Sequence, residues 1–588
     1  MFSPTQSRIF APYFPCLTGI FLVLACITGG LDAGQSGNLT YSATETSVTI
    51  TKCATAASGQ VVIPEMLGGK PVTGIGAAAF SKCENMTGVT IPAGVLDIGN
   101  NAFEDCNGLV TIELPAGLTS LGERAFLRCR NLETTAVPGS VGEISDGVFL
   151  GCYGLVSVTL GNGIKSIGEA GFSSCGKLTA ITLPAGVKTI GSIAFGNCVE
   201  LATVSLPDSL VNIGYAAFAD CASLQSITLP AGLTGLGTAA FSQTGLTSVA
   251  IPGGVNVIPE KAFFNCDALS GVTIGDGVKK IEPDAFGLSD AIVSINLPAS
   301  INKVTRGSFH YCMGLTSISV APGNATYSGV DGILFDKKKS TLILCPAAKT
   351  SADLLPATLK NIEELSFERC VSLASVTFPN GLKSIAPRAF ERCAGLTELT
   401  IPASVTSLTA GSFAFCSGLE DITVTPGGTA YSSVEGVVYN KDQTTTVLCP
   451  AMKPGKVKLP ASVTKVDTIS FRSCTELTAV DLPKGLKSIG IKAFVGCASL
   501  KKVTIPVGVN RIDNQAFKGC GNLRAAYFEG NAPRMGYGVF FETAPDYTTY
   551  FLSGKKGFTT PIWKGQACRK LGAAVSTTGR VLEMLIGR

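Results

Sequence analysis

Apolar and polar positions follow the same order in a unit that recurs every twenty-three positions along most of the chain. In the unit 103–125, apolar residues recur neither at helical nor at strand spacing throughout, so no single helix or strand spans it. Alternation is local, at 109–114, and stops at Pro115, which cannot donate to a strand ladder. The pattern predicts a short strand there, a turn, a second extended edge at 118–121, and one or two helical turns around Phe126.

A phenylalanine marks each unit, and eighteen phenylalanines keep the register. Fifteen are followed three positions later by cysteine, and the other three by Thr244, Ser289 or Thr543, so the slot favours small volume over sulfur chemistry. Such self-similarity is typical of a solenoid, in which each coil buries its apolar face only by stacking on its neighbours. The anchors are Phe80, Phe103, Phe126, Phe149, Phe172, Phe195, Phe218, Phe241, Phe263, Phe286, Phe309, Phe367, Phe390, Phe413, Phe471, Phe494, Phe517 and Phe540.

The pattern therefore predicts an α/β repeat solenoid of about eighteen coils, each as long as the interval from Phe80 to Phe103. A parallel β-sheet is expected on one face, and short helices or turns on the other. Because stacked strands lie ~4.8 Å apart, eighteen coils make a rod or shallow arc of roughly 85 Å.

The unit reads Ala-Phe-x-x-Cys-x-x-Leu-x-x-Ile-x-Leu-Pro-x-x-Val-x-x-Ile-Gly, and it resembles the BspA-type class of leucine-rich repeat found in bacterial and protist surface proteins. The resemblance covers about residues 60–545, and the segments 61–76 and 528–558 are similar to the opening and closing segments of that family. It implies secretion and protein binding or adhesion, and it implies no reaction.

These boundaries divide the chain into eight segments. They are a signal peptide at 1–33, an N-terminal cap at 34–75, repeats at 76–323, an inserted hairpin at 324–350, repeats at 351–428, a second inserted hairpin at 429–453, repeats at 454–545, and a C-terminal cap and tail at 546–588.

The N-terminus carries Arg8 and an apolar run at 16–28 that is too short for a membrane span, followed by a small residue. We expect a secretory signal cleaved after Ala33. The alternative is a lipoprotein signal that acylates Cys26 and anchors the protein to a membrane. No later stretch reaches the length of about 18 apolar residues that a membrane span needs. A secreted or cell-surface location is therefore expected, with no membrane span in the mature chain.

Twenty-one cysteines in an exported chain suggest a disulfide framework. Cysteines one coil apart stack at about one strand spacing, so distance does not exclude disulfides between neighbours. However, the slot accepts Thr and Ser, which favours a row of buried free thiols, with scattered disulfides as the alternative. Metal binding is not expected, because no Cys-x-x-Cys pair occurs and His310 is the single histidine.

The period breaks twice, between Phe309 and Phe367 and between Phe413 and Phe471, where the interval grows to fifty-eight positions. The two insertions resemble each other and are offset by the same interval as Phe309 and Phe413, which indicates a duplication. In each, two β-rich runs flank a short polar turn, at 336–340 or 440–444, and this predicts a hairpin. Insertions in solenoids often carry binding, and the alternative is a coil that only sets curvature.

Charge is distributed unevenly between the halves. Residues 1–323 hold 15 basic and 22 acidic residues, a net charge of −7, whereas residues 324–588 hold 31 and 20, a net charge of +11. The basic half suits an acidic glycan, an anionic surface or an acidic protein, and the alternative is a solvated rim. The candidate binding residues in the hairpins and the basic half are Tyr327, Phe335, Lys337, Lys338, Lys339, Tyr431, Tyr439, Lys441, Lys555 and Lys556.

The outward position of the strands is threonine in nine of seventeen coils, from Thr90 to Thr504, and Tyr527 is its one aromatic residue. Threonine suits an exposed strand, so this face is interpreted as structural. If a protein partner exists, the hairpins and the C-terminal cap are better candidates.

No catalytic constellation emerges. His310 has no partner imidazole, and no glycine-rich stretch is followed by a P-loop Lys-Ser/Thr. We therefore expect no enzyme and no cofactor. A nucleic-acid partner is not expected either, because the aromatic residues are mostly core anchors. The leading hypothesis is a monomeric scaffold that binds host, matrix or neighbouring-cell macromolecules. The alternatives are a structural surface rod without a ligand and a glycan-binding solenoid.

Overall fold

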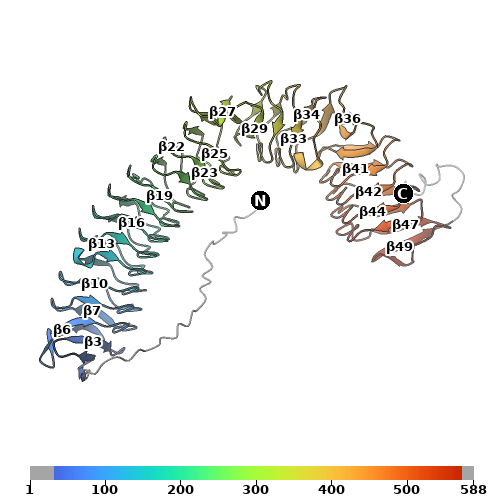
Figure 1. Ribbon diagram of the computed structural model, residues 1–588. Helices are drawn as coiled ribbons and strands as arrows, with labels where there is room; N and C mark the ends of the chain where they lie inside the picture. The colour runs from blue at the N-terminus through green and yellow to red at the C-terminus, as the bar shows by residue number, and fades with distance from the viewer. Residues whose placement is uncertain (1–31, 573–588) are drawn as a thin grey trace.

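A computed structural model describes residues 32–572 of the chain. The expected signal segment and Cys26 lie outside these residues, apart from Asp32 and Ala33, which begin strand β1 (Asp32–Ser36). The described chain is a solenoid of stacked coils bent into an open arch (Figure 1). Most coils give one strand to a first row and a second, usually shorter strand to a second row, and the strands within each row are parallel; the coil after Phe218 gives no first-row strand.

The first row holds the strand that follows each Phe-x-x-Cys segment. Its strands are β4 (Gly59–Val62), β7 (Met86–Thr90), β9 (Thr111–Glu113), β11 (Thr134–Val137), β13 (Ser157–Leu160), β15 (Ala180–Thr182), β17 (Thr203–Ser205), β20 (Ser248–Ile251), β22 (Gly271–Ile274), β24 (Ser294–Leu297), β26 (Ser317–Val320), β30 (Ser351–Ala352), β32 (Ser375–Val376), β34 (Glu398–Ile401), β35 (Asp421–Val424), β39 (Gly455–Lys458), β41 (Leu477–Asp481), β43 (Lys502–Ile505), β45 (Ala525–Phe528), β47 (Thr548–Leu552) and β49 (Gln566–Leu571).

The second row follows the proline that ends each first-row segment. Its strands are β6 (Lys70–Ile75), β8 (Asp97–Ile98), β10 (Ser120–Leu121), β12 (Glu143–Ile144), β14 (Ser166–Ile167), β16 (Thr189–Ile190), β18 (Asn212–Ile213), β19 (Gly235–Leu236), β21 (Val257–Ile258), β23 (Lys280–Ile281), β25 (Lys303–Val304), β31 (Asn361–Ile362), β33 (Ser384–Ile385), β40 (Lys465–Val466), β42 (Ser488–Ile489), β44 (Arg511–Ile512) and β46 (Arg534–Met535). Two short antiparallel strands complete the caps, β5 (Met66–Leu67) beside β6 and β48 (Ile562–Trp563) beside β49.

Of the short helices or turns expected on this face, the turns are confirmed, and the helical turns expected around Phe126 are wrong. The described residues contain only two 3-10 helices, η1 (Gly139–Val141) and η2 (Ala410–Phe413). Elsewhere the segment is a series of turns whose amides bond across to the next coil, as from Phe103 N to Ala125 O at 2.7 Å. Left-handed residues on both sides, such as Asn101 and Asp105 around Phe103, prevent a continuous helix.

The core contains a stack of phenylalanine rings and a row of thiols beside it. From Phe80 to Phe309 the rings are stacked with centroids 4.9–5.6 Å apart. All nineteen described cysteines are buried and unpaired. From Cys106 to Cys221, each thiol donates to the carbonyl oxygen of the phenylalanine of the preceding coil, as from Cys106 to Phe80 at 3.0 Å.

The hydroxyl residues in the cysteine slot also donate. Ser289 Oγ reaches Phe263 O at 2.9 Å, and Thr244 and Thr543 donate to the carbonyl of the phenylalanine in their own coil. The slot therefore selects a small hydrogen-bond donor as well as small volume, which is why Ser and Thr replace Cys. Burial also raises the pKa of the Cys175 thiol well above its usual value, so it stays protonated.

Each insertion forms a three-stranded antiparallel meander rather than a two-stranded hairpin. The first meander is β27 (Tyr327–Val330), β28 (Ile333–Asp336) and β29 (Thr341–Leu344). The second is β36 (Tyr431–Val434), β37 (Val437–Asn440) and β38 (Thr445–Leu448). The expected hairpin lies within each, and an additional turn splits the first expected strand in two. In Figure 1 the two meanders lie near the top of the arch.

The N-terminal cap has the same design. Its strands β1, β2 (Leu39–Ala43) and β3 (Val48–Cys53) form an antiparallel meander, and β3 then pairs in parallel with β6 of the second row. In the insertions, β29 pairs in parallel with β31, and β38 with β40. Each meander is followed by a new first-row strand, β4, β30 or β39. The solenoid therefore begins three times, and we call the resulting parts block one (32–324), block two (325–429) and block three (430–572).

Candidate interaction surfaces

The aromatic side chains proposed for binding are needed by the meanders themselves. Phe335 is fully buried, Tyr439 is 1% exposed and Tyr327 is 7% exposed. Within β28, Leu334 packs into the core of block one, whereas Ile333 and Phe335 pack into that of block two. Both faces of the central strand are therefore covered, and Phe335, Tyr327 and Tyr439 are not available to a partner.

The hydroxyls of Tyr327 and Tyr431 close the end of the preceding block. The second row stops at β25, which leaves the amide of Val304 without a strand partner, and this amide donates to Tyr327 Oη at 2.9 Å. The amide of Leu408 donates to Tyr431 Oη in the same way, at 2.9 Å. Both tyrosines are therefore structural, because they satisfy the edge of a sheet that the meander interrupts.

The polar turns of the meanders are exposed. Lys338, Lys339 and Lys441 face solvent, whereas the ammonium group of Lys337 donates to the carbonyl of Asn324. The Asp336 carboxylate fixes the first turn by accepting from the amides of Ser340 and Thr341 at 2.6 and 2.9 Å.

In the second meander, Asn440 Oδ1 holds the amides of Thr444 and Thr445 in the same way, at 2.8 and 2.9 Å. Lys555 and Lys556 lie apart from both meanders, in the turn after β47, where Lys555 is half-buried and Lys556 exposed.

The first-row face changes character at the C-terminal end. Thr90 to Thr423 are exposed along this face, as expected. From β43 onward, Thr504, Tyr527, Tyr550 and Arg569 are register partners. The rings of Tyr527 and Tyr550 stack with centroids 5.1 Å apart, and burial raises the pKa of Tyr527.

The sequence pattern revealed only the first member of this cluster. Tyr550 follows Tyr527 by one repeat period, as Tyr527 follows Thr504, so the repeat itself carried the signal. Arg569 follows Tyr550 by less than one period, and only the pairing of β47 with β49 places it in the row. We call Tyr527, Tyr550 and Arg569 the aromatic end of the first row.

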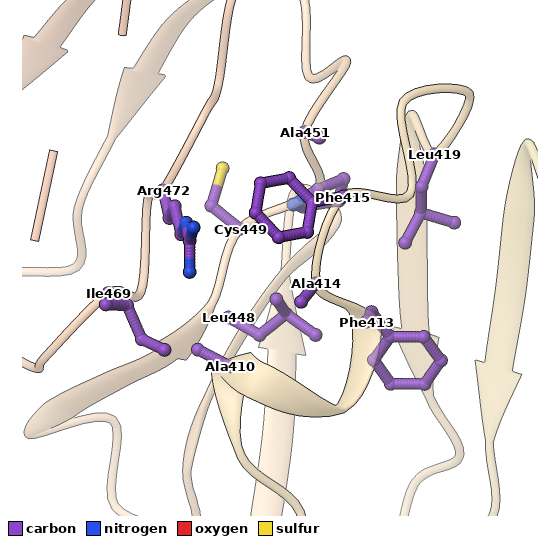
Figure 2. Close-up of a pocket in the computed structure, with 11 residues that line it drawn as sticks. Ala410, Phe413, Ala414, Phe415, Leu419, Leu448, Cys449, Ala451, Ile469 and Arg472 are labelled. Atoms are coloured by element: carbon purple, nitrogen blue, oxygen red, sulfur yellow. The ribbon is translucent and has the colours of Figure 1, made fainter. Parts of the chain in front are cut away.

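The junction between blocks two and three contains a small cavity. It lies among Phe413, Phe415, Leu448 and Arg472, and in Figure 2 Arg472 faces the ring of Phe415. The guanidinium carbon is 4.3 Å from the ring centroid. The cavity volume of about 20 Å³ suffices for a single water molecule, so it is no small-molecule site.

The corresponding junction between blocks one and two holds the single histidine. His310 Nδ1 lies 3.3 Å from Asp284 Oδ1, and Nε2 lies 2.9 Å from Glu368 Oε1. Burial lowers the pKa of His310, but the hydrogen bonds and charges of the two carboxylates outweigh it and raise the pKa to about 9. Held as a cation between two acids, His310 is a structural group and a poor general base.

Neither a membrane-spanning helix nor a metal-binding cluster occurs within residues 32–572. No helix there is long and apolar enough to cross a bilayer. Within the same range, no three His, Cys, Asp or Glu side chains come together in an arrangement that would hold a metal ion.

A family model described as BspA type leucine rich repeat region (6 copies) matches residues 73–202, 188–316, 349–440 and 449–556. No curated protein matches the chain. Solved structures that match include a leucine-rich repeat protein from Bacteroides ovatus, at 20% identity over 92% of this chain and all of that one, with a TM-score of 0.32.

Two further matches cover less of this chain. The T. pallidum leucine rich repeat protein is 30% identical over 36% of this chain and 86% of its own, with a TM-score of 0.27. A leucine rich cell surface protein from Faecalibacterium prausnitzii is 21% identical over 77% and 95%, with a TM-score of 0.26. The residues that the family model matches make up more than half of the chain.

Proposed function

Because the chain belongs to the BspA type leucine rich repeat family, we propose that it is a surface-displayed scaffold that binds a protein partner through the aromatic end of the first row. Family membership supports a scaffold role, and the signal-like N-terminal sequence supports display outside the cytoplasm. The partner is a protein of the host, the matrix or a neighbouring cell.

The observation that carries this proposal is the change of residue type along one face. For most of its length the first row presents Thr, Ser and Ala, which offer little binding energy to a partner. At its C-terminal end it presents two stacked tyrosines and an arginine on adjacent strands. Tyr and Arg are the residue types that dominate the energetics of protein interfaces, so this end is the best-supported contact surface.

The exposed lysines form a second candidate contact. Lys338, Lys339 and Lys441 project from the turns of the two meanders, and Lys556 and the half-buried Lys555 lie in the turn after β47. Such rim charges mainly raise association rates and make binding salt-dependent. Lys337 contributes less, since the carbonyl of Asn324 holds its ammonium group.

Capture of extracellular or cell-surface proteins by the immobilised protein tests the proposal. We expect a captured protein to be lost with Tyr527→Ala and with Tyr550→Ala, and retained with Thr400→Ala, a matched truncation on the same face. The double variant Lys338→Gln/Lys339→Gln should lower the association rate and its salt dependence. Undiminished capture by both tyrosine variants would exclude this surface, and the absence of any captured protein would favour the alternatives, a surface rod without a ligand or a binder of glycans.

A further inference from the structure

The second row of block three carries one cation on each of four consecutive coils. Lys465, Lys487, Arg511 and Arg534 are all exposed. The strands β40, β42, β44 and β46 are adjacent and parallel, and Ser488 beside Lys487 pairs with Lys465 on one side and Arg511 on the other. Neighbouring strands are ~4.8 Å apart, so the four charges span roughly 15 Å.

The second row at the other end of the molecule has the opposite character. Its exposed residues include Asp97 and Glu143, with Ser120 on the coil between them. The fold therefore does not require cations at these positions, because acids and a serine serve the same strands in block one. Block one also carries Lys280 and Lys303 on two neighbouring second-row strands, so what distinguishes block three is a cation on each of four consecutive coils.

Two of the four cations are partly neutralised. Lys465 lies 2.8 Å from Asp467, and Arg511 lies 2.8 Å from Asp513. Among the residues that the structure describes, neither Lys487 nor Arg534 forms an ion pair with a carboxylate. These two cations are available to an external anion at little desolvation cost.

The row ends in a hollow of about 400 Å³ formed by the paired strands β44 and β46 and the residues that follow each of them. Arg511, Asp513, Asn514, Arg534 and Tyr537 line it, and Asn514 Oδ1 accepts from the amide of Tyr537 at 2.9 Å. The side chain of Tyr537 is 68% exposed, and its ring meets that of Phe541 edge-on, with the centroids 5.1 Å apart. The hollow thus combines a guanidinium without an ion-pair partner, amide and carboxylate groups, and an aromatic ring held at a fixed angle.

We propose that this hollow binds an acidic sugar unit of a linear anionic polysaccharide, whose chain continues along the second row over Lys487 and Lys465. A guanidinium binds a carboxylate or a sulfate through two parallel hydrogen bonds, which Arg534 is free to make. Tyr537 offers a flat apolar surface for one face of the sugar ring, while Asn514 and Asp513 have the polarity to bond its hydroxyls. One cation per coil then meets successive charges of the polymer, so the weak contacts add through multivalency.

A polysaccharide fits this surface better than a single-stranded nucleic acid. Nucleic-acid grooves place aromatic side chains under successive bases. Here the exposed aromatic residues, Tyr537 and Phe541, are confined to the end of the row, and the coils of Lys465 and Lys487 offer only apolar or polar groups. The surface is also distinct from the proposed protein-binding face, because it belongs to the second row of strands and the aromatic end to the first.

Binding of the full mature chain to defined polymers tests the proposal by titration calorimetry. The probes are polygalacturonate for carboxylates, heparin for sulfates, dextran as the neutral control and a single-stranded oligonucleotide. We expect polygalacturonate, heparin or both to bind, dextran not to bind, and the affinity to fall with added salt. The stronger of the two acidic polymers identifies the anionic group.

Matched variants locate the site. Arg534→Gln and Tyr537→Ala should each weaken binding about tenfold, the effect of one lost charge-assisted or stacking contact. Arg534→Lys keeps the charge and loses the two-point geometry, so it should lie between Arg534→Gln and the wild type. Lys501→Gln removes an exposed charge beside the first-row strand of the same block and should bind as the wild type does. Circular dichroism and the fluorescence of Trp563 confirm that each variant is folded.

Several results would overturn the assignment. They are the absence of acidic-polymer binding, equal binding by Arg534→Gln and the wild type, an equal loss with Lys501→Gln, or tighter binding of the oligonucleotide than of either polysaccharide. Tyr550→Ala should leave polysaccharide binding unchanged, so failure of this assignment and failure of the proposed protein-binding face are separate outcomes.

Discussion

The two junctions between blocks have the same backbone design and different side-chain chemistry. Each joins the last coil of one block to a meander that begins the next, and equivalent residues are offset by the same interval as Phe309 and Phe413. At junction one, His310 bridges Asp284 and Glu368, and Arg306 pairs with Glu364 at 2.9 Å. At junction two, the residues equivalent to His310 and Arg306 are alanines, so this ionic network is absent there.

Junction two is held by an aromatic ring instead. Phe415 lies between Arg392 and Arg472, whose guanidinium carbons are 5.6 and 4.3 Å from its centroid. Its equivalent at junction one, Tyr311, has Arg369 over it, with the guanidinium carbon 3.8 Å from the ring centroid. The comparison shows that the meander fixes the geometry of the joint, while the side chains that cover it are free to diverge after duplication.

Both meanders differ from the N-terminal cap in how much of them is buried. The central cap strand β2 is fully buried only at its ends, Leu39 and Ala43, whereas the central strands β28 and β37 bury both faces. The rings of Phe309 and Phe367, and of Phe413 and Phe471, do not stack across the junctions within the described chain. Each inserted meander therefore separates two hydrophobic cores, and this explains why its aromatic residues point inward.

Removal of large buried side chains from the inserted meanders has the largest expected effect on the free energy of unfolding. Phe335→Ala and Tyr439→Ala each leave a cavity in a close-packed core and should cost about 3–5 kcal/mol of stability. Because the cores are separate, Phe335→Ala should lower amide protection in block two and Tyr439→Ala in block three. Hydrogen exchange followed by mass spectrometry resolves the blocks, and Trp563 fluorescence reports on block three.

Leu334→Ala is the matched control for this prediction, since it is the neighbour of Phe335 on the opposite face of β28. It should lower protection in the last coils of block one. If Leu334→Ala and Phe335→Ala lower amide protection in the same block, the meander does not separate two cores.

Much of this fold was predictable because one short-range rule is repeated many times. The register of the repeat placed the phenylalanine stack, the cysteine slot and the exposed threonine face. The third strand of each meander was missed, although Asp331-Gly332 and Glu435-Gly436 mark its turn. All four residues have positive φ, and Asp-Gly is a strong signal for a two-residue hairpin turn.

Other features were not accessible from a single sequence. The left-handed positions next to the phenylalanines are occupied by residues as different as Asn101, Arg124 and Ile193. No residue type therefore identifies, from the sequence, the turns that replace the expected helices. The alternation in β28 resembles a half-exposed strand, because periodicity alone does not reveal that a second core covers the other face. Phe335 and Tyr439, which were expected to bind a partner, are buried because this second core covers them. Their structural role therefore could not be predicted from the sequence.

The second prediction separates the junctions by pH. The pKa of His310 is about 9 in the folded protein against 6.5 unfolded, so its contribution is complete below about pH 6.5 and lost as the pH rises through 9. After discounting for solvent screening, we expect about 1–2 kcal/mol at junction one. The amides of 303–312 and 363–371 should therefore be less protected from exchange at pH 10 than at pH 6, after correction for intrinsic exchange rates.

His310→Gln should abolish this difference at junction one and leave 407–416 at junction two unchanged. An equal pH response of both junctions in the wild type, or its persistence in His310→Gln, would contradict the role assigned to the histidine.

The third prediction concerns a contact that the two junctions share. Tyr327→Phe and Tyr431→Phe each remove the hydroxyl that accepts an otherwise unpaired backbone amide, at Val304 and Leu408, and Tyr431→Phe also removes a donor to the carbonyl of Leu408. Each should cost about 1 kcal/mol, since a buried donor loses its partner. The exchange of these two amides should accelerate to a similar degree. A large effect at one junction and none at the other would show that the side-chain chemistry, rather than the meander, determines the stability of the junction.

The smallest effect is expected from the aromatic contact of junction two. Phe415 is 41% exposed, so its interaction with Arg472 lies in the range of surface cation–π contacts, about 0.5–1 kcal/mol. Arg472→Gln removes the charge and keeps most of the side-chain length, so it isolates this contribution from packing. We expect a small loss of protection in 407–416 that is the same at pH 6 and pH 10 and weakly sensitive to salt, because among the described residues no carboxylate forms an ion pair with Arg472. A loss that grows with pH or disappears at high salt would mean that junction two, like junction one, depends on ion pairs, and the chemical difference between the two joints would not hold.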